Sequence, residues 1–248
     1  MSEKVESLRN IALVAHSGAG KTSLAEAMLY NSGTIKRLGR VEDGNTAMDF
    51  EPEELKRLSS ISTGFHQYDW KKSTVTIIDT PGDQNFFSDT LSCQQAADGA
   101  LVVIDAVDGV KVQTEQAWEF AKDFDQPCMI FINKLDRERA DFSRAFQDAA
   151  GIFEPKPIIL QLPIGAEADF KGVIDLISGK AYIYDADGKA QKSDIPADMQ
   201  ELVASEKEKL IENIAEADDE LIERYLEGEE LGEEDLRAAL RKPLRVKP

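Results

Sequence analysis

Hydrophobic residues occur in two patterns along the chain, short uninterrupted runs and stretches with helical spacing, and the two alternate. The runs predict strands at residues 11–15, 65–70, 75–78, 100–104 and 128–132. The helical spacing predicts helices at residues 21–29, 86–97, 112–124 and 137–150. Strands that are apolar throughout are typical of a parallel sheet buried on both faces. The pattern therefore predicts an α/β fold, a doubly wound and mostly parallel sheet covered by helices.

The pattern changes near Pro155. Short strands are predicted at residues 158–162, 173–177 and 181–184, followed by helices at residues 199–214, 220–226 and 233–240. Short strands joined by glycine turns favour a smaller, antiparallel α+β unit. We therefore predict a first domain of residues 1–156 and a second of residues 157–248.

Residues 31–62 contain glycines and charges but show no apolar period. This composition fits a long loop better than regular structure, and long loops within compact domains are usually functional. One or two helical turns are expected at residues 53–58.

The overall composition is that of a globular protein, with 42% hydrophobic and 31% charged residues among 248. No run approaches the roughly 18 apolar residues of a membrane span, and the N-terminus has no signal-peptide core. We therefore expect a cytoplasmic protein with no membrane partner. The net charge of −18 argues against nucleic-acid binding by this chain alone, and so against direct DNA binding.

The first predicted strand leads into a loop of small residues and then a helix. The loop reads His16-Ser17-Gly18-Ala19-Gly20, and the helix begins at Lys21-Thr22. Amide N–H groups of such a loop converge on one point and bind phosphate. Lys21 can reach β- and γ-phosphates, and Thr22 carries a hydroxyl of the type that ligates Mg²⁺. Ala15 stands where the motif has its first glycine, and alanine is tolerated there if φ is negative.

Two further motifs follow the ends of predicted strands. In Asp79-Thr80-Pro81-Gly82, the carboxylate can hold Mg²⁺ through water, and the glycine N–H can approach a γ-phosphate. In Asn133-Lys134-Leu135-Asp136, the last carboxylate matches the two donors on the edge of guanine. Alone, these motifs fit an ordinary turn and a helix cap. In order behind a phosphate loop, at the carboxyl ends of parallel strands, they predict a GTP-binding domain.

With these motifs the chain resembles the GTPase domain of elongation factor G, and within that family the branch called elongation factor G-like proteins. The resemblance covers about residues 8–242 and rests on AHSGAGKTSLAEAMLY, GRVEDGNTAMDFEPEELKR, DTPG, INKLDRERADF and LQLPIGAEADFKGVIDLI. The last stretch lies in the G′ insert that this family carries within its nucleotide domain. The resemblance implies a P-loop GTPase sheet with a G′ insert, switch I at residues 33–62 and switch II at residues 79–97. It also implies that the chain stops before the family's final strand and helix, leaving one sheet edge bare.

The resemblance gives each motif residue a role. Nucleotide contacts are implied for Ala15, His16, Ser17, Gly18, Ala19, Gly20, Lys21, Thr22, Ser23, Asp79, Thr80, Pro81, Gly82, Asn133, Lys134 and Asp136. Mg²⁺ ligands are implied at Thr22, Ser60 and Asp79, and catalytic roles at Lys21, Gly82 and Asp83. The implied cofactors are GTP or GDP and Mg²⁺. The implied partner is the ribosome, reached through the full-length protein, with the ribosomal stalk protein a candidate at the G′ insert.

Three positions depart from the family pattern. Gly18 replaces an Asp of the phosphate loop, Ser60 replaces the Thr of R-G-I-T, and Asp83 replaces a His that orients the attacking water. Serine keeps the hydroxyl but loses the β-branch that restricts its rotamer. We therefore expect nucleotide binding to survive and hydrolysis to be slow.

Three functions remain open from the sequence. The first is the GTP-binding and GTP-hydrolysing domain of an elongation factor G-like protein at the ribosome. The second is a non-catalytic, GTP-gated binding module, which ribosome-stimulated phosphate release would distinguish from the first. The third is a relative of ribosomal protection proteins or class II release factors, which share the motifs and differ in later domains.

Overall fold

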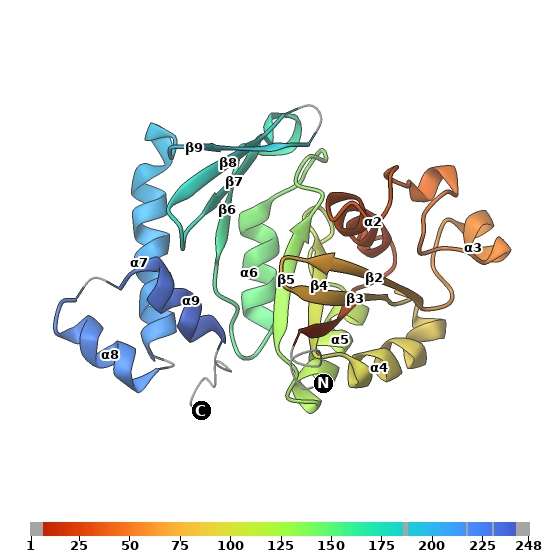
Figure 1. Ribbon diagram of the computed structural model, residues 1–248, viewed down its shortest axis with the longest axis horizontal. Coiled ribbons are helices and arrows are strands. Elements are labelled where there is room, and N and C mark those ends of the chain that lie inside the picture. Colours follow the sequence, from red (N-terminus) through yellow and green to blue (C-terminus); the bar gives the residue numbers. More distant parts are fainter. Residues whose placement is uncertain (1–6, 186–187, 217, 230, 242–248) are drawn as a thin grey trace. The chain divides into compact units, whose positions relative to one another are not determined.

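The computed structural model describes residues 7–185, 188–216, 218–229 and 231–241 (Figure 1). The chain divides into two compact units. The first consists of Met1–Lys134 and Ser143–Phe153, and the second of Leu135–Phe142 and Glu154–Pro248.

The first unit is built on a five-stranded sheet in the order β2-β3-β1-β4-β5. The strands are β1 (Leu8–Val14), β2 (Gly64–Trp70), β3 (Ser73–Asp79), β4 (Gly99–Asp105) and β5 (Cys128–Asn133). Neighbouring strands are parallel except for β2 and β3, which a short turn joins directly. The predicted doubly wound, mostly parallel sheet is confirmed.

Helices cover both faces of this sheet because successive strand side chains point to opposite sides. Helix α2 (Lys21–Asn31) packs on the face that contains Leu13, Ile77 and Leu101. The other face carries α4 (Phe87–Ala96), α5 (Val112–Asp123) and α6 (Phe142–Ile152). In that second layer the rings of Trp118 and Phe153 stack with centroids 4.3 Å apart.

The segment between α2 and β2 is mostly irregular, as its composition predicts. It contains the 3₁₀ turn η1 (Val41–Asp43) and the helix α3 (Pro52–Arg57), which lies at the predicted position. A further 3₁₀ turn, η2 (Gln84–Phe86), precedes α4.

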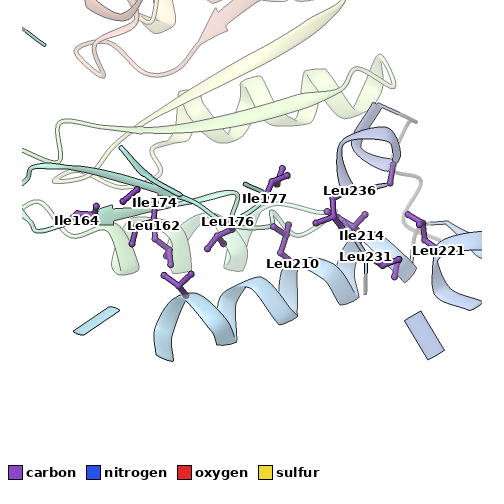
Figure 2. Close-up of a cluster of buried hydrophobic side chains, with 14 residues drawn as sticks. Leu162, Ile164, Ile174, Leu176, Ile177, Leu210, Ile214, Leu221, Leu231 and Leu236 are labelled. Atoms are coloured by element: carbon purple, nitrogen blue, oxygen red, sulfur yellow. The ribbon is translucent and has the colours of Figure 1, made fainter. Parts of the chain in front are cut away.

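The second unit pairs an antiparallel sheet with helices. The sheet has the order β6-β7-β8-β9, formed by β6 (Gln161–Ile164), β7 (Gly172–Asp175), β8 (Lys180–Tyr184) and β9 (Ala190–Ser193). The helices are α7 (Gln200–Glu216), α8 (Asp219–Leu226) and α9 (Glu233–Arg241), with short turns η3 (Glu167–Asp169) and η4 (Ala197–Met199). Figure 2 shows Leu210 of α7 directed toward the sheet side chains of this unit's core. Within the described ranges, no helix is long and apolar enough to span a membrane.

Three elements differ from their prediction. The helix predicted at residues 137–150 begins at Phe142, because Arg139 has a φ of +67° and interrupts it. The first strand of the second unit starts at Gln161 rather than residue 158. Strand β9 escaped prediction because all four of its residues are exposed and carry no apolar pattern.

In the division into compact units, residues 135–142 group with the second unit. Two hydrogen bonds connect these residues to Glu167 of the same unit. The N–H of Glu167 donates to the carbonyl of Leu135 at 2.8 Å, and the N–H of Arg139 donates to the Glu167 carboxylate at 2.7 Å.

Candidate nucleotide-binding site

Residues 15–20 connect β1 to α2 in a tight loop at the carboxyl end of β1. Gly18 and Gly20 have φ values of +83° and +96°, a left-handed region that favours glycine. A Cβ at Gly20 would lie 2.3 Å from the side-chain nitrogen of Asn133, so glycine also makes room for the second motif. Ala15 is fully buried and is not among the residues with positive φ, which explains why alanine is tolerated there.

The Lys21 side chain curls back over the loop. Its Nζ donates to the carbonyls of Ala15 and His16 at 3.2 and 3.1 Å. Burial lowers the pKa of Lys21 to about 8, an effect that the carboxylates of Asp79 and Asp49 partly offset. The ammonium group is therefore held beside the amides that are expected to bind phosphate.

Two hydroxyls and two carboxylates lie together next to Lys21, and each hydroxyl donates to one of the carboxylates. The Thr22 hydroxyl donates to Asp79 Oδ2 at 2.7 Å and lies 3.1 Å from the Ser60 hydroxyl. The Ser60 hydroxyl donates to Asp49 Oδ1 at 2.7 Å. All three predicted metal ligands are thus brought together, and Asp49, which the sequence reasoning missed, joins them.

The environment of Asp79 fits a hydrated cation. Asp79 is 1% exposed, and among the described residues its Oδ1 is buried without a hydrogen-bond partner. Burial raises the pKa of Asp79 to about 6 against the opposing effects of Lys21 and Thr22, and burial also raises the pKa of Asp49. Hydroxyl and carboxylate oxygens are the hard ligands that Mg²⁺ prefers, and an unpaired carboxylate oxygen can accept a metal-bound water. The residues present therefore fit Mg²⁺.

The segment after β3 lies against the phosphate loop. The Thr80 hydroxyl donates to the carbonyl of Leu13 at 2.7 Å, and the Pro81 carbonyl accepts from the Thr90 hydroxyl at 2.8 Å. A Cβ at Gly82 would lie 2.5 Å from both Lys21 Nζ and the Ser17 nitrogen. Glycine is the residue that permits this close approach.

Asp83 has a structural partner in its own segment. Its Oδ1 accepts the backbone N–H of Asn85 and the Asn85 side-chain amide, both at 2.8 Å. Asp83 is thus the N-cap of η2. It also lines a cleft of about 320 Å³ whose walls include His16, Ser17 and Gly82.

The third motif reaches the phosphate loop through two side chains. The Asn133 amide donates to the carbonyl of Ala19 at 2.9 Å, and Lys134 Nζ donates to the carbonyl of Gly18 at 2.6 Å. Lys134 also pairs with Asp105 at 2.7 Å. Burial favours a higher pKa for Asp105, but the bonds from Lys134 and from the backbone outweigh it and lower that pKa. Asp136 belongs to the second compact unit, so its part in reading guanine stays a prediction.

A family model described as the elongation factor Tu GTP binding domain matches residues 6–232 of the chain. The chain belongs to the elongation factor Tu GTP-binding domain family. It is a GTP-binding domain of the translational GTPase type.

Relatives in this family include longer proteins. Elongation factor G of Thermotoga sp. (strain RQ2) is 40% identical over 240 residues, which are 96% of this chain and 34% of that protein. Elongation factor G 1 of Synechocystis sp. is 40% identical over 244 residues, 97% of this chain and 35% of that protein. A crystal structure of a Thermus thermophilus protein matches with a TM-score of 0.88 at 36% identity, covering 96% of this chain and 36% of that one. The chain spans about a third of these relatives' length, and its resemblance to elongation factor G is confirmed.

The His16 side chain is buried beside the phosphate loop. It is 3% exposed, and its Nδ1 lies 3.1 Å from the hydroxyl of Thr114. Burial, with the nearby Lys111 and Lys21, lowers the pKa of His16 to about 4. The imidazole is therefore neutral at physiological pH.

The sequence reasoning missed Asp49 and Asp105 for different reasons. Asp105 directly follows an apolar run, and a carboxylate at the end of a parallel strand is a signal that could have found it. Asp49 lies in a segment without periodicity, and its place in the site depends on how that segment folds.

Proposed function

We propose that this chain binds GTP with Mg²⁺ and hydrolyses it to GDP and phosphate, as the nucleotide domain of an elongation factor G-like protein that acts at the ribosome. The observation that supports this best is the meeting of Lys21, Thr22 and Asp79 at one loop, to which Asn133 and Lys134 are also bonded.

In this proposal the loop holds the phosphates and the metal. The amides of residues 17–23 surround the phosphates, with Lys21 on the β and γ oxygens. The Thr22 and Ser60 hydroxyls would hold Mg²⁺ directly, and the carboxylates of Asp79 and Asp49 would hold it through water. When bound, Mg²⁺ neutralises the charge that develops on the transferred phosphoryl group.

Guanine selection is assigned to the third motif. Asn133 and Lys134 fix the loop against the phosphate loop, and Asp136 accepts hydrogen bonds from the N1–H and exocyclic amino group of guanine. Adenine presents an acceptor at the first of these positions, so its binding would leave a carboxylate oxygen facing a lone pair.

Hydrolysis is assigned to the segment after β3. The Gly82 N–H contacts the γ-phosphate, and Lys21 stabilises the charge that develops there. Asp83 stands at the position of the water-orienting group, but its Oδ1 is engaged by Asn85 and it adds negative charge. We therefore infer that turnover is slow without the ribosome and slow with it.

The partners follow from the relatives, which are named elongation factor G. We infer that the ribosome is engaged through the full-length protein in the cytoplasm, with the ribosomal stalk protein contacting the second unit.

Nucleotide selectivity tests the binding part of the proposal. Isothermal titration should give a GDP affinity at least 100-fold above the ADP affinity. Asp136→Asn should weaken GDP and gain binding of xanthosine diphosphate, a gain that also shows the variant to be folded. Equal GDP and ADP affinities would overturn the proposal. Ribosome-dependent phosphate release by the full-length protein tests the hydrolytic part separately.

A further inference from the structure

Two glutamates of the first unit are buried in an unusual way. Glu26 on α2 and Glu54 on α3 are each 1% exposed, and the hydrogen bonds that the structure gives their carboxylates come from backbone N–H groups. Burial of a charged side chain is costly unless it is compensated by hydrogen bonds. These carboxylates therefore hold the backbone around them rather than fill space.

Glu54 joins two stretches of chain. Its Oε2 accepts the N–H groups of Phe50 and Glu51 at 3.2 and 3.0 Å. Its Oε1 accepts the N–H groups of Ile61 and Ser62, both at 2.9 Å.

These four amides directly follow the two residues that the segment contributes to the Mg²⁺ site. Phe50 comes after Asp49, and Ile61 comes after Ser60. The Ser60 hydroxyl donates to the Asp49 carboxylate at 2.7 Å, between the two stretches that are hydrogen-bonded to Glu54. One carboxylate thus fixes the backbone next to both groups.

Glu26 anchors the same segment to the phosphate-loop helix. It lies one turn after Thr22 and accepts the N–H groups of Gly39, at 3.2 Å, and of Ala47. A Cβ at Gly39 would lie 2.5 Å from the Glu26 carboxylate, so this close contact requires a glycine at position 39.

We propose that Glu54 is a positioning residue for the Mg²⁺ site, which holds Ser60 and Asp49 against Thr22 and Asp79, and that Glu26 secures the far end of the segment. The inference rests on the proposed function in one respect, the role of Ser60 as a ligand. A glutamine at position 54 keeps one acceptor oxygen and turns an NH₂ group toward two amide donors. Glu54→Gln should therefore release one of the two stretches.

The test compares Glu54→Gln and Glu26→Gln with Glu53→Gln as a matched control. Glu53 lies on the same helix but is exposed and pairs with Arg57. Hydrogen exchange with GDP and without Mg²⁺ should be at least tenfold faster at residues 50–51 or 61–62 in Glu54→Gln. In Glu26→Gln it should be faster at residues 39 and 47, and in Glu53→Gln it should match the wild type.

The second readout is the Mg²⁺ concentration that half-maximally retains a fluorescent, non-hydrolysable GTP analogue. We expect it to rise at least tenfold in Glu54→Gln, while analogue release in excess EDTA stays unchanged. A purely structural role would accelerate release in EDTA as well, and that result would overturn the proposal. So would wild-type values in both readouts, or faster exchange with an unchanged Mg²⁺ requirement.

Ser60→Ala separates this inference from the proposed function. If Ser60→Ala leaves the Mg²⁺ requirement unchanged, the ligand role of Ser60 is wrong, whereas the exchange data still decide whether Glu54 holds the segment. If Glu54→Gln does not fold, Glu26→Gln decides: a raised Mg²⁺ requirement supports the proposal and a wild-type one overturns it.

Discussion

The phosphate loop, with the first turn of α2, and the segment of residues 39–62 each contribute a hydroxyl to the proposed Mg²⁺ site, yet they are held in different ways. The loop is local, a turn of six residues between β1 and α2 in which Gly18 and Gly20 take left-handed conformations. The segment is held by carboxylate bonds from Glu26 and Glu54 to amides up to 21 residues away. The phosphate loop is therefore recognisable as a short sequence motif. The segment of residues 39–62 is held by long-range contacts that leave no pattern in the sequence.

The largest effect should come from breaking the local half at Gly20. Gly20→Ala places a Cβ 2.3 Å from Asn133 at a positive φ, and overpacking with left-handed strain costs about 2–4 kcal/mol. Gly18→Ala is the matched control, because it meets nothing within 4 Å and carries only the strain, about 1–2 kcal/mol. Urea denaturation of both variants measures the difference. Equal losses would show that Asn133 does not press on the loop.

The junction between the loop and the segment after β3 is tested at Gly82. Gly82→Ala should lower single-turnover GTP hydrolysis about 100-fold, about 2.7 kcal/mol in barrier, because its Cβ would meet Lys21 and Ser17 at 2.5 Å. Gly151→Ala on α6, with open space around its Cβ, should leave the rate unchanged. The idea fails if GDP affinity falls as much as the rate, since the change would then have damaged the whole site.

Burial of His16 in the phosphate loop should make the stability of the protein sensitive to acid. Burial holds the pKa of His16 near 4, below its unfolded value of 6.5, so the unfolded chain binds more protons between those pH values. Stability should therefore fall as the pH drops from 6.5 toward 4, by about 2–3 kcal/mol from this residue. Urea midpoints at pH 7 and 4.5 should show a smaller loss in His16→Gln. His66→Gln, on the edge strand β2, should keep the wild-type loss, and an equal loss in all three proteins would exclude His16 as the source.

The smallest effect is expected at Asp83. Asp83→His should hydrolyse GTP about tenfold faster on the ribosome in the full-length protein, about 1.4 kcal/mol in barrier, since an imidazole donates a hydrogen bond without adding negative charge. Asp83→Ala controls for loss of the cap on Asn85. Single-turnover rates that are equal in all three proteins would make Asp83 a bystander.

Features with a local sequence signal were predictable, and features that depend on long-range contacts were not. The strands that end in Asp79 and Asn133 were predictable because an apolar run followed by a polar motif is a local signal. Strand β9 and the start of α6 were not, since the first is wholly exposed and the second depends on a left-handed Arg139. Glu26 and Glu54 could not be assigned because a charged side chain on a short helix is ordinarily solvated. Their burial depends on the path of residues 39–62.

The burial of Trp118 against Phe153 gives the first unit an intrinsic fluorescent probe of its core. The chain has two tryptophans, and they differ sharply in surroundings, since Trp118 is 7% exposed in the core while Trp70 on the edge strand is 49% exposed. A buried indole emits at shorter wavelength and resists aqueous quenchers, whereas an exposed one does neither. With Trp70 replaced by Phe, the native fluorescence of Trp118 would follow the sheet and its helical layer without an attached dye.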